Sequence, residues 1–187
     1  MNIVFAIPGF QTDSKSAMGR AVRKVVDTVG KQVGKATFKP GVVVFRIDRA
    51  FHARSSKQEN ATALEVLLAG LCALNRIWLQ CYPSTPPLAA TPVYYERTVV
   101  WDTIPALLSR GFGDCKSLSA CEVAEFREQG VWCRPVFRFQ GNPSAIMFHI
   151  LIMLEGGEWK DPSAERGMLS YQETHEGGSI PGNIHGY

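Results

Sequence analysis

The chain has 187 residues and a mass of 20.6 kDa, with 20% charged residues and a formal net charge of +3. This length suits one domain with a sizeable core, and the composition excludes a fibre, a disulfide-dense mini-protein and a wholly disordered chain. The basic residues do not gather in a stripe along the sequence, so no nucleic-acid partner is expected.

The sequence offers no clear targeting signal. The apolar residues 1–10 lack a preceding basic region and a small-residue cleavage pattern, which argues against a signal peptide. The most apolar later stretch, residues 66–79, is interrupted by two polar residues and is too short to span a bilayer. The odd number of cysteines, with no CxxC pair, favours reduced thiols over a disulfide framework. We therefore expect a cytoplasmic protein with no membrane partner, although export by another route stays open.

The first predicted elements are a helix and a strand. Apolar residues recur at helical spacing over residues 17–33, with charged residues between them, which predicts an amphipathic helix. The apolar run at residues 42–47 follows a glycine and predicts a strand. The polar residues 48–59 are expected to form a loop.

A long apolar helix is predicted over residues 61–81, with Asn60 as its cap. Its leucines surround much of its circumference, so we expect the domain to pack around it. Prolines make the following segment irregular and suggest a boundary there. The boundary would separate an N-terminal region, residues 1–92, packed on the core, from residues 93–175, which carry the chemistry.

The C-terminal part combines helices with an antiparallel meander. Asp102 can cap a short helix at about residues 103–109, and a second helix over residues 115–129 ends at Gly130. The glycine-rich residues 176–187 are expected to form a flexible tail. Short connections predict three consecutive antiparallel strands, at residues 131–139, 146–154 and 158–161.

The most informative stretch is Gly-Asp-Cys-Lys at residues 113–116. If Asp114 caps the helix, Cys115 lies in the first turn, where unpaired N–H groups and the helix dipole lower a thiol's pKa. The same N–H groups can stabilise an oxyanion, and Lys116 adds a positive charge nearby. An inert, buried thiol is the equally weighted alternative at this stage, and the other four cysteines fit it because they lie among apolar residues.

His149 lies in a strand that is apolar on both faces and is therefore expected to be central. A lone histidine there is usually a core residue, and both of its ring nitrogens need partners. The Cys115 thiol on one side and the Asp161 carboxylate on the other would supply them.

This arrangement depends on the loop before the last strand. A two-residue turn would place Asp161 on the face opposite His149. A three-residue loop at residues 155–157 would pair Leu154 with Glu158 and place Asp161 on the face of His149. The triad hypothesis therefore requires a loop of odd length or a bulge.

This order of residues resembles the transglutaminase-like branch of the papain-like cysteine enzymes. The resemblance rests on RGFGDC at residues 110–115, His149 in its apolar strand, and WKDP at residues 159–162; QGVWCRPV at residues 129–136 looks like that family's passage from the nucleophile helix into the first core strand. It covers roughly residues 98–163. It implies an α+β fold with a nucleophile-bearing helix packed on an antiparallel β-sheet and an N-terminal helical extension.

The resemblance also implies the roles of the three residues. Cys115 would be the nucleophile, His149 the base and then the acid, and Asp161 the group that orients His149. The family's reactions share acyl transfer through a thioester.

The oxyanion donors are less clear. Trp101 can take the part of the upstream tryptophan of transglutaminases, and Asp114 and Lys116 are further oxyanion or substrate-binding candidates. Where papain has a glutamine, this sequence has Ser109, so the second oxyanion donor stays unassigned.

We therefore expect a cysteine-dependent acyl-transfer enzyme that cleaves or transamidates a peptide or isopeptide amide of a protein or peptide substrate, with hydrolysis favoured and no cofactor. The alternative is a catalytically silent transglutaminase-like binding module. A metal site is the competing chemical interpretation, but the possible ligands lack zinc-finger spacing and no metal is expected.

Overall fold

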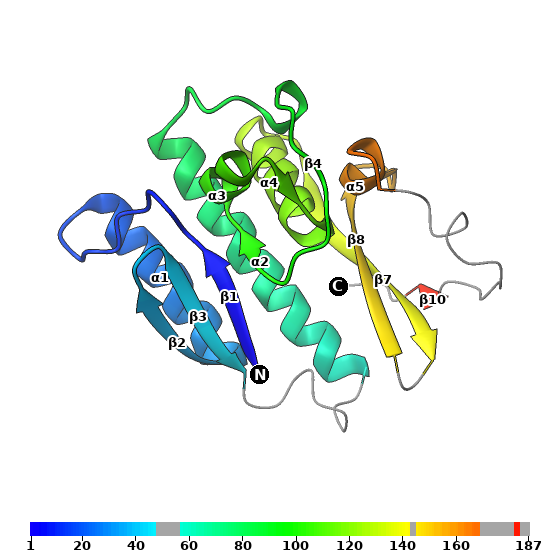
Figure 1. The fold of residues 1–187 in the computed structure, drawn as a ribbon, viewed down its shortest axis with the longest axis horizontal. Coiled ribbons are helices and arrows are strands. Elements are labelled where there is room, and N and C mark those ends of the chain that lie inside the picture. The colour runs from blue at the N-terminus through cyan, green and yellow to red at the C-terminus, as the bar shows by residue number, and fades with distance from the viewer. Residues whose placement is uncertain (48–56, 143–144, 169–181, 184–187) are drawn as a thin grey trace.

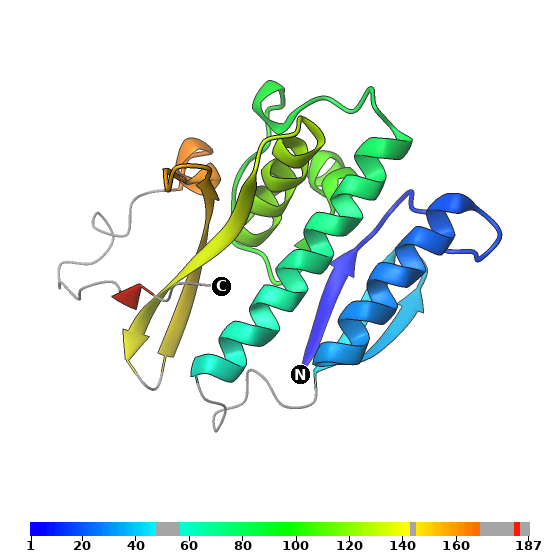
Figure 2. The ribbon, with the colours of Figure 1, turned by 180° about the vertical axis from the view of Figure 1, so that it is seen from behind.

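Two four-stranded sheets lie on opposite sides of one long helix, α2 (Lys57–Cys81), as Figures 1 and 2 show from two opposite directions. Helices and strands both contribute to one hydrophobic core, so the fold class is α+β, as the sequence predicts. The computed structural model describes residues 1–47, 57–142, 145–168 and 182–183.

The first sheet joins three strands from the first half of the predicted N-terminal region to the segment before the site. Its strand order is β2 (Gly34–Lys39), β3 (Val42–Ile47), β1 (Asn2–Ala6) and β5 (Trp101–Asp102). The predicted strand at residues 42–47 is confirmed, whereas the other three strands are not predicted. β1 is antiparallel to β3 and parallel to β5. The N-terminus therefore shares a sheet with the chain that leads to the candidate site.

Helix α1 (Ala17–Val33) has the bounds that the sequence predicts. The Ser16 hydroxyl caps it by accepting a hydrogen bond from the Gly19 N–H at 2.9 Å. Val22 and Val26 on its apolar face are fully buried, and the helix packs against α2, β2 and β3.

Helix α2 is the centre of the core, as predicted, but it begins earlier than expected. It starts at Lys57, so Asn60 lies buried inside the helix and is not its cap. Leu67 and Leu71 are fully buried in a hydrophobic cluster that also contains residues of both sheets. The helix is longer than the apolar stretch at residues 66–79, and by length and composition Glu59–Cys81 could cross a bilayer. The expectation that this part of the chain is too short to do so is therefore wrong. Half of its most apolar window is buried in this core.

Helix α3 (Ile104–Arg110) is present, but Asp102 does not cap it. Thr103 occupies the N-cap position and makes no side-chain cap. The first-turn N–H of Ile104 instead donates to Asn75 Oδ1 of α2, at 2.9 Å. A side chain from a neighbouring helix therefore satisfies the donor that a local cap would have satisfied.

The second sheet is the predicted antiparallel meander, and helix α4 (Cys115–Glu128) packs against it and against α2. A short helix, α5 (Pro162–Glu165), follows the last strand of the meander. In the predicted tail, the structure describes only residues 182–183, which pair with β7; the rest of residues 176–187 lies outside the described residues. The strand order is β10 (Gly182–Asn183), β7 (Cys133–Asn142), β8 (Ala145–Leu154) and β9 (Trp159–Lys160).

A two-stranded parallel ladder lies beside the start of α4. It pairs β4 (Tyr94–Tyr95) with β6 (Phe112–Gly113), so that Tyr95 lies opposite Gly113. Gly113 is tightly enclosed, because a Cβ atom there would lie 2.4 Å from Cδ1 of Leu107. The chain just before Cys115 is thus held closely on two sides.

Candidate active site

The loop between β8 and β9 has the length that the triad hypothesis requires. The Leu154 N–H donates to the Glu158 carbonyl at 2.8 Å, which leaves residues 155–157 as the loop. Ile152 pairs with Lys160, so the next residue, Asp161, comes level with Leu151 on the His149 face of the strand.

Asp161 reaches His149 and also begins helix α5. Its Oδ2 atom lies 2.8 Å from Nε2 of His149. Its Oδ1 atom accepts hydrogen bonds from the backbone N–H groups of Ser163 and Ala164 at 3.0 and 3.1 Å. One oxygen of the carboxylate therefore holds the helix cap, and the other orients the imidazole.

Electrostatics favour the charged form of His149. Burial alone would lower the pKa of His149, but hydrogen bonds to Asp161 and to the Cys115 side chain, with the charges on both, raise it to about 9. Burial likewise opposes ionisation of Asp161, yet His149 and the two N–H donors bring the pKa of this carboxyl below its ordinary value. The ring thus lies between a thiol and a carboxylate, and Nδ1 is the nitrogen left for the thiol.

Cys115 occupies the first position of α4, where its backbone N–H has no intrahelical acceptor. Asp114 is the N-cap residue, as predicted, and its carbonyl accepts the first helical hydrogen bond, from Leu118 at 2.9 Å. The expectation that its side chain caps the helix is wrong, because the Asp114 carboxylate makes no capping hydrogen bond.

Lys116 is directed to Asp114 and not to the thiol. Its ammonium group pairs with the Asp114 carboxylate and donates to the Thr98 carbonyl at 2.6 Å. Burial raises the pKa of Asp114, and Lys116 partly offsets this effect. The pair therefore binds the chain around Thr98 to the start of α4.

Trp101 is a core residue beside the site. Its ring is buried, stacks on Phe5 at a centroid distance of 5.4 Å, and lies 5.9 Å from the Lys116 ammonium. These contacts hold the Trp101 ring in place beside the start of α4.

A second ion pair near the start of α4, between Asp102 and Arg110, was not predicted. The Asp102 carboxylate is fully buried and lies 3.0 Å from the Arg110 guanidinium. Burial raises the pKa of Asp102 to about 6, Arg110 opposes this rise, and Asp114 adds to it. The Asp102 N–H also donates to Ser117 Oγ of α4, at 3.0 Å. An acidic residue just before a helix looks like a cap in the sequence. The sequence alone therefore does not show that Asp102 pairs with Arg110 instead.

Two cations hold the segment that carries Asp161. Lys160 lies 3.0 Å from the buried Glu122 of α4 and also pairs with Glu165. Arg166 donates to the Thr91 carbonyl at 2.9 Å and to other carbonyls of the proline-rich segment. The residues on both sides of Asp161 are thereby joined to α4 and to the segment before β4.

The site is accessible to solvent. The His149 and Asp161 side chains are 29% and 30% exposed, and Cys115 is half-buried. Of the other thiols, Cys72 is buried and Cys81 is exposed, and burial raises the pKa of Cys72 to about 12. Among the described residues, Cys115 is thus the thiol that combines access with an interaction with a histidine.

His149 and Asp161 lie in hydrogen-bond contact, and Cys115 is near enough to raise the pKa of His149. The described part of the chain brings no three His, Cys, Asp or Glu side chains into a metal-binding group. No protein-family model matches the chain, and no curated protein or solved structure matches it. Any function must therefore be argued from this geometry.

Proposed function

We propose that the chain is a cysteine-dependent acyl-transfer enzyme of the transglutaminase-like type, acting on a peptide or isopeptide amide. The observation that carries the proposal is one imidazole shared by two partners. Asp161 lies 2.8 Å from Nε2 of His149, and the Cys115 side chain lies close enough to the same ring to raise its pKa. The thiol sits at a helix N-terminus, where backbone N–H groups can bind a developing negative charge.

The chemistry follows from these positions. The Cys115 thiolate attacks the amide carbon, an S–C bond forms, and the carbonyl electron pair moves to oxygen. When the tetrahedral intermediate collapses, the C–N bond breaks and protonated His149 gives its proton to the leaving amine. The acyl group remains on Cys115 as a thioester. Asp161 keeps the imidazole oriented and stabilises its charged form throughout.

The thioester can be released in two ways. Water, activated by His149, gives hydrolysis, and an amine gives transamidation. We favour hydrolysis, with a protein or peptide as substrate. No cofactor is proposed, because every catalytic group that the cycle needs is a side chain or backbone group of this chain.

Selective alkylation tests the proposal without a known substrate. Iodoacetamide at neutral pH should modify Cys115 faster than the exposed Cys81, as read by mass spectrometry of tryptic peptides. His149→Ala should remove this difference, and Cys115→Ala should remove the fast adduct while leaving the folded state intact. Cys81 serves as the internal control, because it is more exposed than Cys115 and has no resolved histidine partner. Equal, slow modification of both thiols would instead favour the catalytically silent binding module.

A further inference from the structure

The proposed reaction needs a second oxyanion donor, which the sequence leaves unassigned. The backbone N–H of Cys115 is one donor at the helix start. The Lys116 ammonium is engaged by Asp114 and the Thr98 carbonyl, and the Trp101 ring is packed on Phe5. The chain on another side of the thiol offers a further donor.

The backbone places Tyr95 on such a side. β4 is parallel to β6, with Tyr95 opposite Gly113, and the Glu96 N–H donates to the Gly113 carbonyl at 2.9 Å. The Tyr95 N–H donates to the Arg166 carbonyl at 2.8 Å, just beyond the helix that Asp161 caps. Tyr95 is therefore held between the chain leading to Cys115 and the helix that begins at Asp161.

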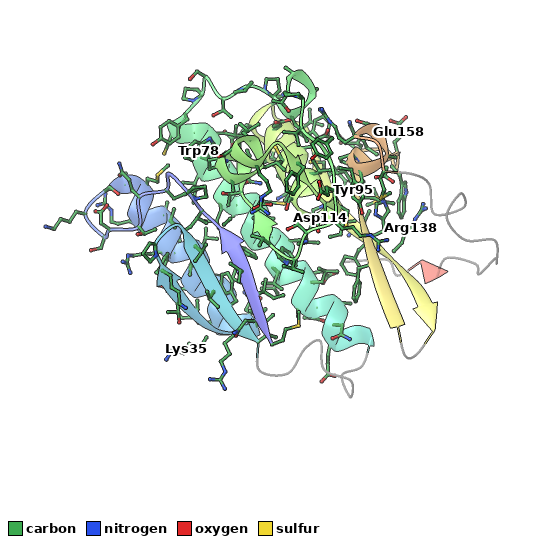
Figure 3. The ribbon with its side chains drawn as sticks, in the orientation of Figure 1. Lys35, Trp78, Tyr95, Asp114, Arg138 and Glu158 are labelled. Atoms are coloured by element: carbon green, nitrogen blue, oxygen red, sulfur yellow. The ribbon has the colours of Figure 1, made fainter. Side chains whose placement is uncertain are left out.

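The Tyr95 side chain is turned toward the start of α4. Its half-buried ring packs on the small hydrophobic cluster that includes Leu118, one turn after Cys115, and Figure 3 labels Tyr95 close to Asp114 in this region. Burial raises the pKa of the Tyr95 hydroxyl, and the nearby Cys115 and Asp114 raise it further. The neighbouring Tyr94 is exposed, and its hydroxyl donates to Glu96 at 3.1 Å.

The Tyr95 hydroxyl can also act as a hydrogen-bond donor. A phenol hydroxyl has one proton to donate and lone pairs to accept. Burial raises the pKa of Tyr95 more than the neighbouring Arg97 lowers it, so the proton stays on the oxygen at neutral pH.

Building on the proposed function, we propose that the Tyr95 hydroxyl donates the second hydrogen bond to the oxyanion formed when Cys115 attacks the substrate carbonyl. The backbone N–H of Cys115 donates the first. No proton leaves Tyr95: its O–H bond stays intact while the carbonyl oxygen gains and then loses negative charge.

Two electrophiles separate this role from a structural one. Acylation by p-nitrophenyl acetate passes through a tetrahedral oxyanion, whereas alkylation by iodoacetamide displaces iodide and forms none. Both rates are measured on the full chain carrying Cys81→Ser, which removes the exposed competing thiol. The variant is Tyr95→Phe, which removes one oxygen atom, and the matched control is Tyr94→Phe.

We expect Tyr95→Phe to slow acylation of Cys115 by about 10²–10³-fold, the usual cost of removing one oxyanion donor, and to leave its alkylation rate within about twofold. Tyr94→Phe should change neither rate. Unchanged acylation in Tyr95→Phe, or equal slowing of both reactions, would overturn the role of Tyr95 while the fast alkylation of Cys115 still supports the proposed function. Slow alkylation in the parent protein would overturn the proposed function itself.

Discussion

The carboxylate of Asp161 should control the charge of His149, and Asp161→Asn tests this directly. The substitution keeps the shape of the side chain and an oxygen that can still accept from Ser163 and Ala164, so α5 should keep its cap. It removes the negative charge beside Nε2 of His149. The expected result is a fall in the pKa of His149 with no change of fold.

The size of the fall follows from the balance at the ring. Burial lowers the pKa of His149 from 6.5, and interactions with Asp161 and Cys115 together raise it to about 9. Asp161 contributes both a hydrogen bond and a charge, so its loss should lower the pKa of His149 by about 1–3, the usual effect of one nearby opposite charge, with Cys115 alone opposing burial. A change of this size corresponds to roughly 1–4 kcal/mol less preference for the protonated ring.

Histidine-selective NMR measures this pKa. The chain has four histidines, and His149→Ala identifies the signal of interest. Glu165→Gln is the matched control, because it also removes a negative charge from α5. The Glu165 carboxylate pairs with Lys160 and not with His149. We expect the control to leave the His149 pKa near the wild-type value. A pKa that stays near 9 in Asp161→Asn would refute the reasoning, since the carboxylate would then not be the source of the raised value.

Three further outcomes are expected from urea unfolding. Stability should fall as pH rises from 6.5 through about 9, because folded His149 keeps a proton that the unfolded chain releases, and His149→Ala should show a smaller fall over this range; equal pH dependence in both proteins would contradict this. Asn75→Ala should cost about 1–3 kcal/mol, because it leaves the buried N–H of Ile104 without its acceptor; a neutral effect would show that the bond adds nothing. Gly70→Ala should destabilise by about 1–2 kcal/mol despite better helix propensity, because its Cβ would lie 2.5 Å from Val29; a more stable variant would contradict the close packing.

The long, strongly patterned elements could be predicted from the sequence, and the short ones could not. The helix at residues 17–33 and the strand at residues 42–47 carry clear periodicity over their whole length. By contrast, β4, β5 and β6 have two residues each, so no period exists to detect. Their pairing depends on contacts between segments far apart in the chain, which local patterns do not encode.

Helix starts show the same limit. Asn60 and Asp102 have the residue types of good caps, yet one lies inside α2 and the other is a buried partner of Arg110. The donor at the start of α3 is satisfied by Asn75 from another helix. A cap can therefore be replaced by tertiary contacts that a local rule does not include.

The sequence reduced the convergence of His149 and Asp161 to one condition, the length of the loop between their strands, because strand register can be counted. The three-residue loop alone decides which face Asp161 occupies, and the structure has that loop. The direction of Lys116 and the position of Tyr95 were not predictable. The direction of Lys116 depends on the nearby Thr98 carbonyl, and the position of Tyr95 depends on the two-residue ladder between β4 and β6.

The divided use of the Asp161 carboxylate has a consequence for how the protein responds to heat. Because the same group starts the turn at residues 161–165 and aligns the imidazole, melting of that turn and loss of ring alignment should be a single event. The thiol would then lose its reactivity at a temperature below the one at which the rest of the molecule unfolds. Local unfolding of this short turn would therefore set the upper temperature limit of the reaction.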